Sequence, residues 1–211
     1  MFNKLYSAVF VVISLGIFGS AHAVPVLLDE TSFNANISGL AVQVEDFEGI
    51  TAGVYASPFT FANGTYSATA DAAVQSGSLF CVTGQCLTNQ NIIGPKTFDS
   101  LAADTLYWGT DFYNILGASD PFQVTVVGGS GTGVFSGNGS HNGFWGFYDA
   151  LGIQSITFEN LGINGGYINY SFDNITTASL SSVPEPGSLG LLGLAMVIAG
   201  LMMRRKRSLL I

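Results

Sequence analysis

The stretch Phe122-Gln123-Val124-Thr125-Val126 alternates strictly between apolar and polar residues. A period of two places the apolar side chains on one face of a β-strand and the polar ones on the other. The same period recurs in three further stretches: Ile156 and Phe158 against Ser155, Thr157 and Glu159; Ile168, Tyr170 and Phe172 against Asn169, Ser171 and Asp173; and Leu106, Trp108, Thr110 and Phe112 with Asp111 on the opposite face. The sequence therefore predicts several half-buried strands.

Turns rich in Gly, Asn and Ser separate these strands: 62–64, 128–131, 137–140 and 164–166. No amphipathic helical segment longer than two turns is present. Many short strands joined in this way predict an all-β protein built as an antiparallel β-sandwich. One stretch is irregular, because Val42 and Val44 share a parity that Phe47 does not. If all three are buried, a β-bulge near Glu45 or Asp46 is required.

Residues 1–23 have the features of a signal peptide. Lys4 supplies a positive start, Leu5 to Phe18 an apolar centre, and Ala21-His22-Ala23 a cleavage site with small residues at its first and third positions. Cleavage there would leave Val24 as the first residue of an exported domain, 24–182. A first transmembrane helix is the alternative interpretation of this segment.

The C-terminal segment, 183–211, begins with Val183-Pro184-Glu185-Pro186-Gly187. An apolar run from Leu189 to Met203 follows, and the chain then becomes basic at Arg204, Arg205, Lys206 and Arg207. The run is close to the minimum of about 17 residues that span a bilayer. We therefore expect a short transmembrane helix over about 188–203, with the basic end 204–207 in the cytoplasm. A buried core helix would not explain the basic cluster.

Pro184-Glu185-Pro186, the short Gly-containing apolar span and the basic end together resemble the PEP-CTERM sorting signal of bacterial surface proteins. The resemblance implies that an exosortase, a processing enzyme embedded in the membrane, recognises this tail in cells that make exopolysaccharide. It also implies anchoring in the inner membrane, followed by release to the cell surface or the extracellular space.

The charges of the exported domain are almost all negative. Of six basic residues in the chain only Lys96 lies in the domain, whereas every acidic residue except Glu185 does, for a formal charge near −12. Such a surface repels nucleic acid and anionic lipid, which excludes both as partners. Clustered carboxylates that bind a cation are the alternative to a merely solvated surface.

The two cysteines, Cys81 and Cys86, are separated by four residues. In an exported domain, a pair this close predicts a disulfide that closes a small loop. The spacing differs from the Cys-x-x-Cys of redox enzymes, and two cysteines alone cannot complete a zinc site.

A second resemblance covers 40–178. Val44-Glu45-Asp46-Phe47-Glu48-Gly49 opens the domain, Gly143-Phe144-Trp145-Gly146-Phe147 precedes Ile153 to Phe158, and the strand 170–175 closes it. This order is similar to the jelly-roll domains of PEP-CTERM proteins, which are similar in turn to carbohydrate-binding modules. It implies a jelly-roll-like sandwich.

No catalytic residues are predicted. His141 is the only histidine after residue 23, and no Gly-x-Ser-x-Gly elbow surrounds its neighbour Ser140. From the resemblance of the tail to the PEP-CTERM signal, the predicted sandwich and this lack of a catalytic constellation, we expect a non-enzymatic surface or matrix protein that associates with exopolysaccharide. A secreted polysaccharide hydrolase with paired carboxylates, and a purely structural surface protein, are the alternatives.

The acidic residues of the opening and closing strands predict one structural calcium site. Glu45, Asp46 and Glu48 lie within four residues, and Asp173 lies in the last strand. The first and last strands of a jelly roll commonly pair, which would bring Glu48 or Asp46 beside Asp173. Calcium prefers oxygen ligands and would relieve the repulsion between these carboxylates. The alternative is that Asp173 caps a turn with Asn174 while the acids face solvent.

Overall fold

The computed structural model describes residues 24–69, 71–77, 81, 84–89, 94–114, 121–137, 142–161 and 170–180. The fold described below lies within Met1–Ser179. The expected signal peptide, the expected sorting tail and transmembrane helix, and His141 lie outside the described residues. Within the described ranges, no helix has the length and hydropathy needed to cross a membrane.

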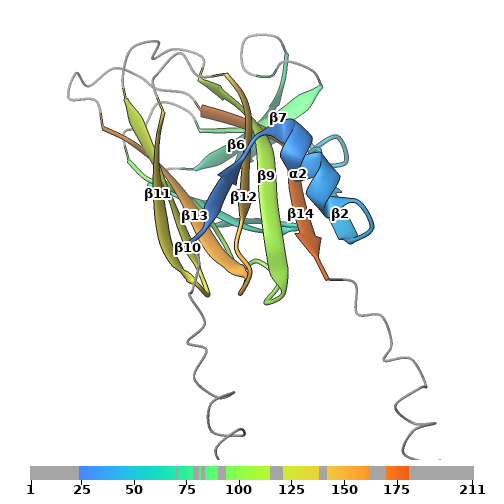
Figure 1. Ribbon diagram of the computed structural model, residues 1–211. Helices are drawn as coiled ribbons and strands as arrows, with labels where there is room; N and C mark the ends of the chain where they lie inside the picture. Colours follow the sequence, from blue (N-terminus) through green and yellow to red (C-terminus); the bar gives the residue numbers. More distant parts are fainter. Residues whose placement is uncertain are drawn as a thin grey trace, which may run out of the picture. The chain divides into compact units, whose positions relative to one another are not determined.

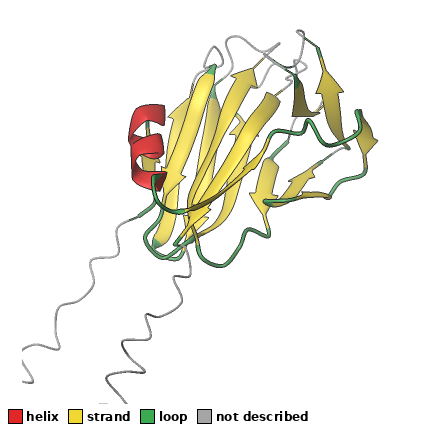
Figure 2. Ribbon diagram, turned by 90° about the vertical axis from the view of Figure 1, so that its right-hand side faces the viewer, coloured by secondary structure: helices red, strands yellow, loops and turns green. Residues whose placement is uncertain are grey.

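Two antiparallel sheets face each other (Figures 1 and 2). The eight-stranded sheet contains, in spatial order, β1 (Val26–Leu28), β12 (Gly143–Tyr148), β9 (Thr105–Asn114), β14 (Tyr170–Ser179), β7 (Gln85–Asn89), β6 (Ala72–Ser76) and β3 (Gly53–Tyr55), with β2 (Ala41–Glu45) also paired to β14. The six-stranded sheet contains β11 (Gly131–Gly137), β10 (Phe122–Gly128), β13 (Ile153–Asn160), β8 (Lys96–Asp99), β5 (Gly64–Ala68) and β4 (Phe59–Phe61).

The path of the chain between the sheets is that of a jelly roll. From β8 onward the chain crosses repeatedly: β8 lies in the six-stranded sheet, β9 in the other, the hairpin β10–β11 in the first again, and β12, β13 and β14 continue the alternation. The prediction of an all-β, jelly-roll-like antiparallel sandwich is confirmed.

The core between the sheets is aromatic. Phe112, Phe158 and Phe172 are fully buried, and their rings lie in contact, with centroids 5.3 Å apart for Phe112 and Phe158 and 5.0 Å for Phe158 and Phe172. Each such side chain contributes about 1.5–3 kcal/mol when it leaves water. The predicted alternation is confirmed in β10, where Phe122, Val124 and Val126 are buried and the residues between them are half-exposed.

The alternation fails at two places. In β14 the polar residues Ser171 and Asp173 are buried as well as the apolar ones. In β2 Val42 and Val44 are 42% and 55% exposed, whereas Phe47 is fully buried. The condition for the expected bulge, burial of all three, is therefore not met. Phe47 reaches the core by a turn with φ of 60°.

The helix α2 (Glu30–Ile37) lies on the outer face of the eight-stranded sheet (Figure 1). Asp29 caps it by accepting a hydrogen bond of 2.8 Å from the Ser32 amide. Phe33 is 1% exposed because Gly109 and Gly146, paired in β9 and β12, leave room for its ring. A Cβ on either glycine would come within 2.9 Å of that ring.

A buried aspartate joins two turns at the end of the sandwich. Asp149 is 1% exposed and follows β12. Its carboxylate accepts hydrogen bonds from the Leu151 amide at 2.8 Å and from the amide and hydroxyl of Ser130 in the β10–β11 turn. A Cβ at Gly128 would lie 2.3 Å from Asp149 Oδ2. The glycine-rich turn predicted at 128–131 is thus present and is fixed by this carboxylate.

Lys96, the basic residue of the exported domain, is fully buried. Its ammonium group donates to the Gly94 carbonyl at 2.7 Å and lies 5.0 Å from the centre of the Tyr170 ring. Burial lowers the pKa of Lys96 to about 8, because the charged form loses its hydration.

Because Lys96 is buried and its pKa is lowered, we predict that the free energy of unfolding rises with pH. Between pH 8 and 10.5 the unfolded chain holds a proton that folded Lys96 has lost, so unfolding becomes less favourable as pH increases. From pH 7.5 to 9.5 we expect a gain of about 2 kcal/mol in the free energy of unfolding, measured by urea denaturation. The Lys96→Met variant should lose this slope. A flat profile in the wild type would contradict the prediction.

Candidate functional site: an acidic junction and the pocket beside it

The strand β14 changes its partner on one side in the middle of its length. Ser171 and Phe172 pair with β7, whereas Ile175 to Ser179 pair with β2. Between the two pairings, Asn174 adopts φ of 49° and the register with β9 shifts. The expected pairing of the opening strand 41–45 with the closing strand is confirmed, and Asp173 lies at the point where the partners change.

The carboxylates of Asp46, Glu48 and Asp111 lie near enough to repel that of Asp173, and we call these four residues the acidic junction. Asp111 is the cross-strand neighbour of Asp173 on β9. Burial, and then repulsion from Asp111, Glu48 and Asp46, raises the pKa of Asp173 to about 6, although a hydrogen bond of 2.7 Å from the Asn174 amide opposes the rise. Negative charge is thus concentrated around Asp173, which is itself only 5% exposed.

Asn174 connects two members of the acidic junction. Its side-chain amide donates to Asp111 Oδ2 at 2.8 Å, while its backbone amide donates to Asp173. Asp46 Oδ1 accepts from the Glu48 amide at 3.1 Å, which fixes the turn that follows β2. These hydrogen bonds hold the carboxylates in place without supplying a positive charge.

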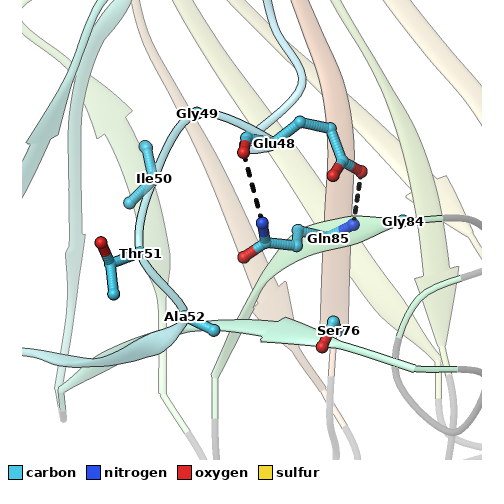
Figure 3. Close-up of a pocket in the computed structure, with 8 residues that line it drawn as sticks. All are labelled: Glu48, Gly49, Ile50, Thr51, Ala52, Ser76, Gly84 and Gln85. Carbon is cyan, nitrogen blue, oxygen red and sulfur yellow. Dashed lines mark hydrogen bonds between the residues drawn. The ribbon is translucent and has the colours of Figure 1, made fainter.

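Glu48 connects the acidic junction to the start of β7 (Figure 3). Glu48 Oε1 accepts from the Gln85 amide at 2.7 Å, and its carbonyl accepts from Gln85 Nε2 at 3.4 Å. The carboxylate lies over Gly84, where a Cβ would come within 1.6 Å of Oε1 and where φ is +52°. Only glycine meets both conditions.

The predicted disulfide is present beside this contact. Cys81 and Cys86 are joined with their Cα atoms 5.6 Å apart, and Gly84 and Gln85 lie within the loop that they close. The Cys81–Cys86 loop therefore brings a backbone amide to Glu48.

A pocket of about 480 Å³ opens next to Glu48. Its walls are the turn Glu48–Ala52, Ser76 at the end of β6, and Gly84 and Gln85 (Figure 3). Gln85 Oε1 is buried and accepts no hydrogen bond from the protein. Carboxylate, amide and hydroxyl groups thus surround a space of the size that small ligands occupy, about 300–1,000 Å³.

The structure brings together three of the four residues predicted to hold calcium. Glu45 is the exception, because its carboxylate accepts from the amides of Phe47 and Ala62. Among the described residues, no group of three or more His, Cys, Asp or Glu side chains has an arrangement that could hold a metal. The calcium site stays a prediction, and its ligands would have to include backbone carbonyls and water.

The sequence did not identify Asp111 or Gln85 as members of this site. Asp111 stood out only as the polar residue of an alternating strand, and its place opposite Asp173 depends on the pairing of β9 with β14. The glutamine beside Cys86 carried no signal of its own.

These features define an acidic, disulfide-containing β-sandwich domain. Residues 182–207 match the PEP-CTERM protein-sorting motif. The chain therefore carries a PEP-CTERM sorting signal, which confirms the resemblance of its tail and implies an exported protein sorted by an exosortase. No curated protein matches the chain.

Similar folds occur in solved structures. The family 11 carbohydrate-binding module of the cellulase Lic26A-Cel5E from Clostridium thermocellum is 16% identical, with 69% of this chain and 99% of that chain covered and a TM-score of 0.36. The solution structure of CtCBM11 gives 16% identity, 67% and 97% coverage, and a TM-score of 0.34. An exo-β-1,3-galactanase from Phanerochaete chrysosporium is 20% identical, with 60% of this chain and 29% of that chain covered and a TM-score of 0.30. At these TM-scores the likenesses identify neither a ligand nor a site in this chain.

Proposed function

We propose that this protein is an exported, non-enzymatic surface or matrix protein that associates with the polysaccharide secreted by the same cells. The observation that carries the proposal is the PEP-CTERM motif at 182–207, because such tails occur in cells that make exopolysaccharide. The pocket beside Glu48 supports it with hydrogen-bonding groups suited to sugar hydroxyls.

The pocket chemistry fits a polyhydroxylated ligand better than an apolar one. Thr51 and Ser76 carry hydroxyls that both donate and accept hydrogen bonds. A sugar ring presents the complementary donors on adjacent carbons. Nucleic acid is disfavoured by the nearby carboxylates, because their charge repels phosphate.

We also propose the route by which the protein reaches the surface. The signal peptide is removed after Ala23, the helix over about 188–203 holds the domain outside the inner membrane, and an exosortase cuts near Pro184 to Pro186. N-terminal sequencing is expected to find Val24 first, and deletion of the exosortase should leave the full-length form in the membrane fraction. An intact Met1, or release unaffected by the deletion, would contradict this route.

A second candidate function is polysaccharide hydrolysis with two carboxylates. The observation in its favour is the cross-strand pair Asp111 and Asp173, since Asp173 has a pKa raised to about 6. Retaining glycosidases place an acid and a nucleophile about 5 Å apart. Against it, Asn174 engages both carboxylates, and Asp173 is 5% exposed. A purely structural surface protein without ligand is the third candidate.

We further propose that the acidic junction binds a structural calcium ion, with Glu48 and Asp173 as its first ligands and Asp46 beside them. The repulsion at Asp173 supports the proposal, because a divalent cation would remove it. The ion would fix the point where β14 changes partner, and so the wall of the pocket that Glu48 forms.

The experiment that tests the proposed function is retention on the polysaccharide of the producing cells. That polysaccharide, coupled to beads, should retain the secreted protein and release it when free polysaccharide is added. Passage without retention would refute the proposal and leave the structural role.

A further inference from the structure

The outer face of the six-stranded sheet carries a row of hydroxyl side chains that runs across the strands. Ser67, Thr97, Thr157 and Thr125 are consecutive cross-strand neighbours on β5, β8, β13 and β10. We call these four residues the threonine row. Val134 on β11 continues it to the edge of the sheet.

The side chains of the threonine row are half-exposed and point away from the core. In each strand they alternate with buried residues, as Thr97 does with Phe98 and Thr157 with Phe158. The helix α2 covers the other sheet, and no described helix or strand lies over this face. The row is therefore open to a ligand.

Hydrogen bonds restrain three of the four hydroxyls of the threonine row. Thr97 Oγ1 and Thr157 Oγ1 share a hydrogen bond of 3.0 Å, and Gln123 Nε2 donates to Thr125 Oγ1 at 3.3 Å. Threonine has few rotamers, so little conformational entropy remains to be lost on binding. Each hydroxyl keeps capacity to donate or accept a further bond.

A hydroxyl-bearing residue recurs along this row on each successive strand, and neighbouring strands lie about 4.8 Å apart. A ligand that uses all of them must be extended, must lie across the strands, and must offer hydrogen-bonding groups repeatedly along its length. A polysaccharide chain has these properties.

The row contains no charged residue, although the exported domain has a formal charge near −12. The described acids of this face, Asp99 on β8 and Glu159 on β13, lie two residues from the row in their strands. An anionic polymer would be repelled by them, whereas an uncharged one would not.

We propose that the threonine row binds an extended, uncharged polysaccharide chain laid across the strands of the six-stranded sheet. The inference rests on the proposed function and names both the ligand class and a surface separate from the pocket beside Glu48. Each hydroxyl contributes weakly, and binding strengthens as a longer chain engages more of the row.

The test is native affinity electrophoresis of the full chain in non-ionic detergent. The gels contain polysaccharide from the producing cells, separated by anion exchange into an uncharged and an anionic pool. The triple variant Thr97→Val, Thr125→Val and Thr157→Val removes three hydroxyls and keeps the branched side chains. Thr31→Val on α2 is the matched control, and thermal melts check that each variant is folded.

The wild type and Thr31→Val should be retarded by the uncharged pool. The affinity of the triple variant should be lower by at least about tenfold, as expected for several lost hydrogen bonds. Equal retardation of the triple variant, or retardation of the wild type by the anionic pool alone, would overturn the inference while the proposed function stands. Loss of binding in a Thr51→Val pocket variant, with the triple variant unchanged, would do the same. A wild type that neither pool retards would refute the proposed function itself.

Discussion

Replacement of Asp149 by alanine should lower the free energy of unfolding of the domain by about 3 kcal/mol, or its melting temperature by roughly 10 °C. The carboxylate is 1% exposed and accepts from the Leu151 and Ser130 amides and from the Ser130 hydroxyl. Alanine would remove all three hydrogen bonds and leave a small cavity where the carboxylate is buried. Thermal denaturation followed by circular dichroism measures the loss.

Two variants make this experiment specific to the Asp149 network. Asp104→Ala removes an exposed carboxylate from the same domain and should change the melting temperature little. Asp149→Asn keeps the shape and one acceptor oxygen, so its loss should lie between those of the alanine variant and the wild type. A loss in Asp149→Ala no larger than in Asp104→Ala would show that the two turns hold without this carboxylate.

Calcium at about 100 times its dissociation constant should stabilise the folded protein by about 2.7 kcal/mol relative to chelator. The reason is the repulsion in the acidic junction, where Asp173 meets Asp111, Glu48 and Asp46. Paired thermal melts in calcium and in chelator measure the shift. Coincident curves would refute the site.

From the raised pKa of Asp173 we also predict how the stability of the calcium-free protein, measured in chelator, depends on pH. The pKa of folded Asp173 is about 6, above its ordinary value of 3.8, so the folded state holds a proton that the unfolded state has released. Stability should therefore fall by about 2 kcal/mol as the pH rises from about 4 to 6. Asp173→Asn should abolish both this slope and the response to calcium, whereas Asp104→Ala should abolish neither.

The fold was predictable because one signal, the alternation of apolar and polar residues, is local to each strand. In β10 it identified the buried residues individually, from Phe122 to Val126. The alternation is less informative where both faces of a strand are buried, as in β14, in which Ser171 and Asp173 are buried against expectation. Val42 and Val44 of β2 depart from expectation in the opposite direction, because they are exposed. This strand has β14 as its described partner and packs little on the core.

The helix α2 was not predicted, although Asp29 and Ser32 have the spacing of an N-terminal cap. Eight residues with one buried side chain give no helical period, and Phe33 finds its place only because Gly109 and Gly146 meet in adjacent strands.

The candidate site was predictable in part. The acidic opening strand and Asp173 were visible in the sequence, and the pairing of β2 with β14 brings their elements together. The sequence did not reveal the roles of Asp111, Gln85, Asp149 and the threonine row. The contacts of these residues depend on which segments become neighbours in the folded domain. Cross-strand register is a property of the folded sheet and is weakly encoded in any one strand.

We propose that this protein holds polysaccharide without cleaving it. To test this, the secreted protein is incubated with polysaccharide from the producing cells, and retention on the polymer and the appearance of reducing ends are followed in the same sample. We expect retention that free polysaccharide reverses, with no increase in reducing ends over time. New reducing ends that disappear in Asp173→Asn would contradict the claim and establish the hydrolase instead.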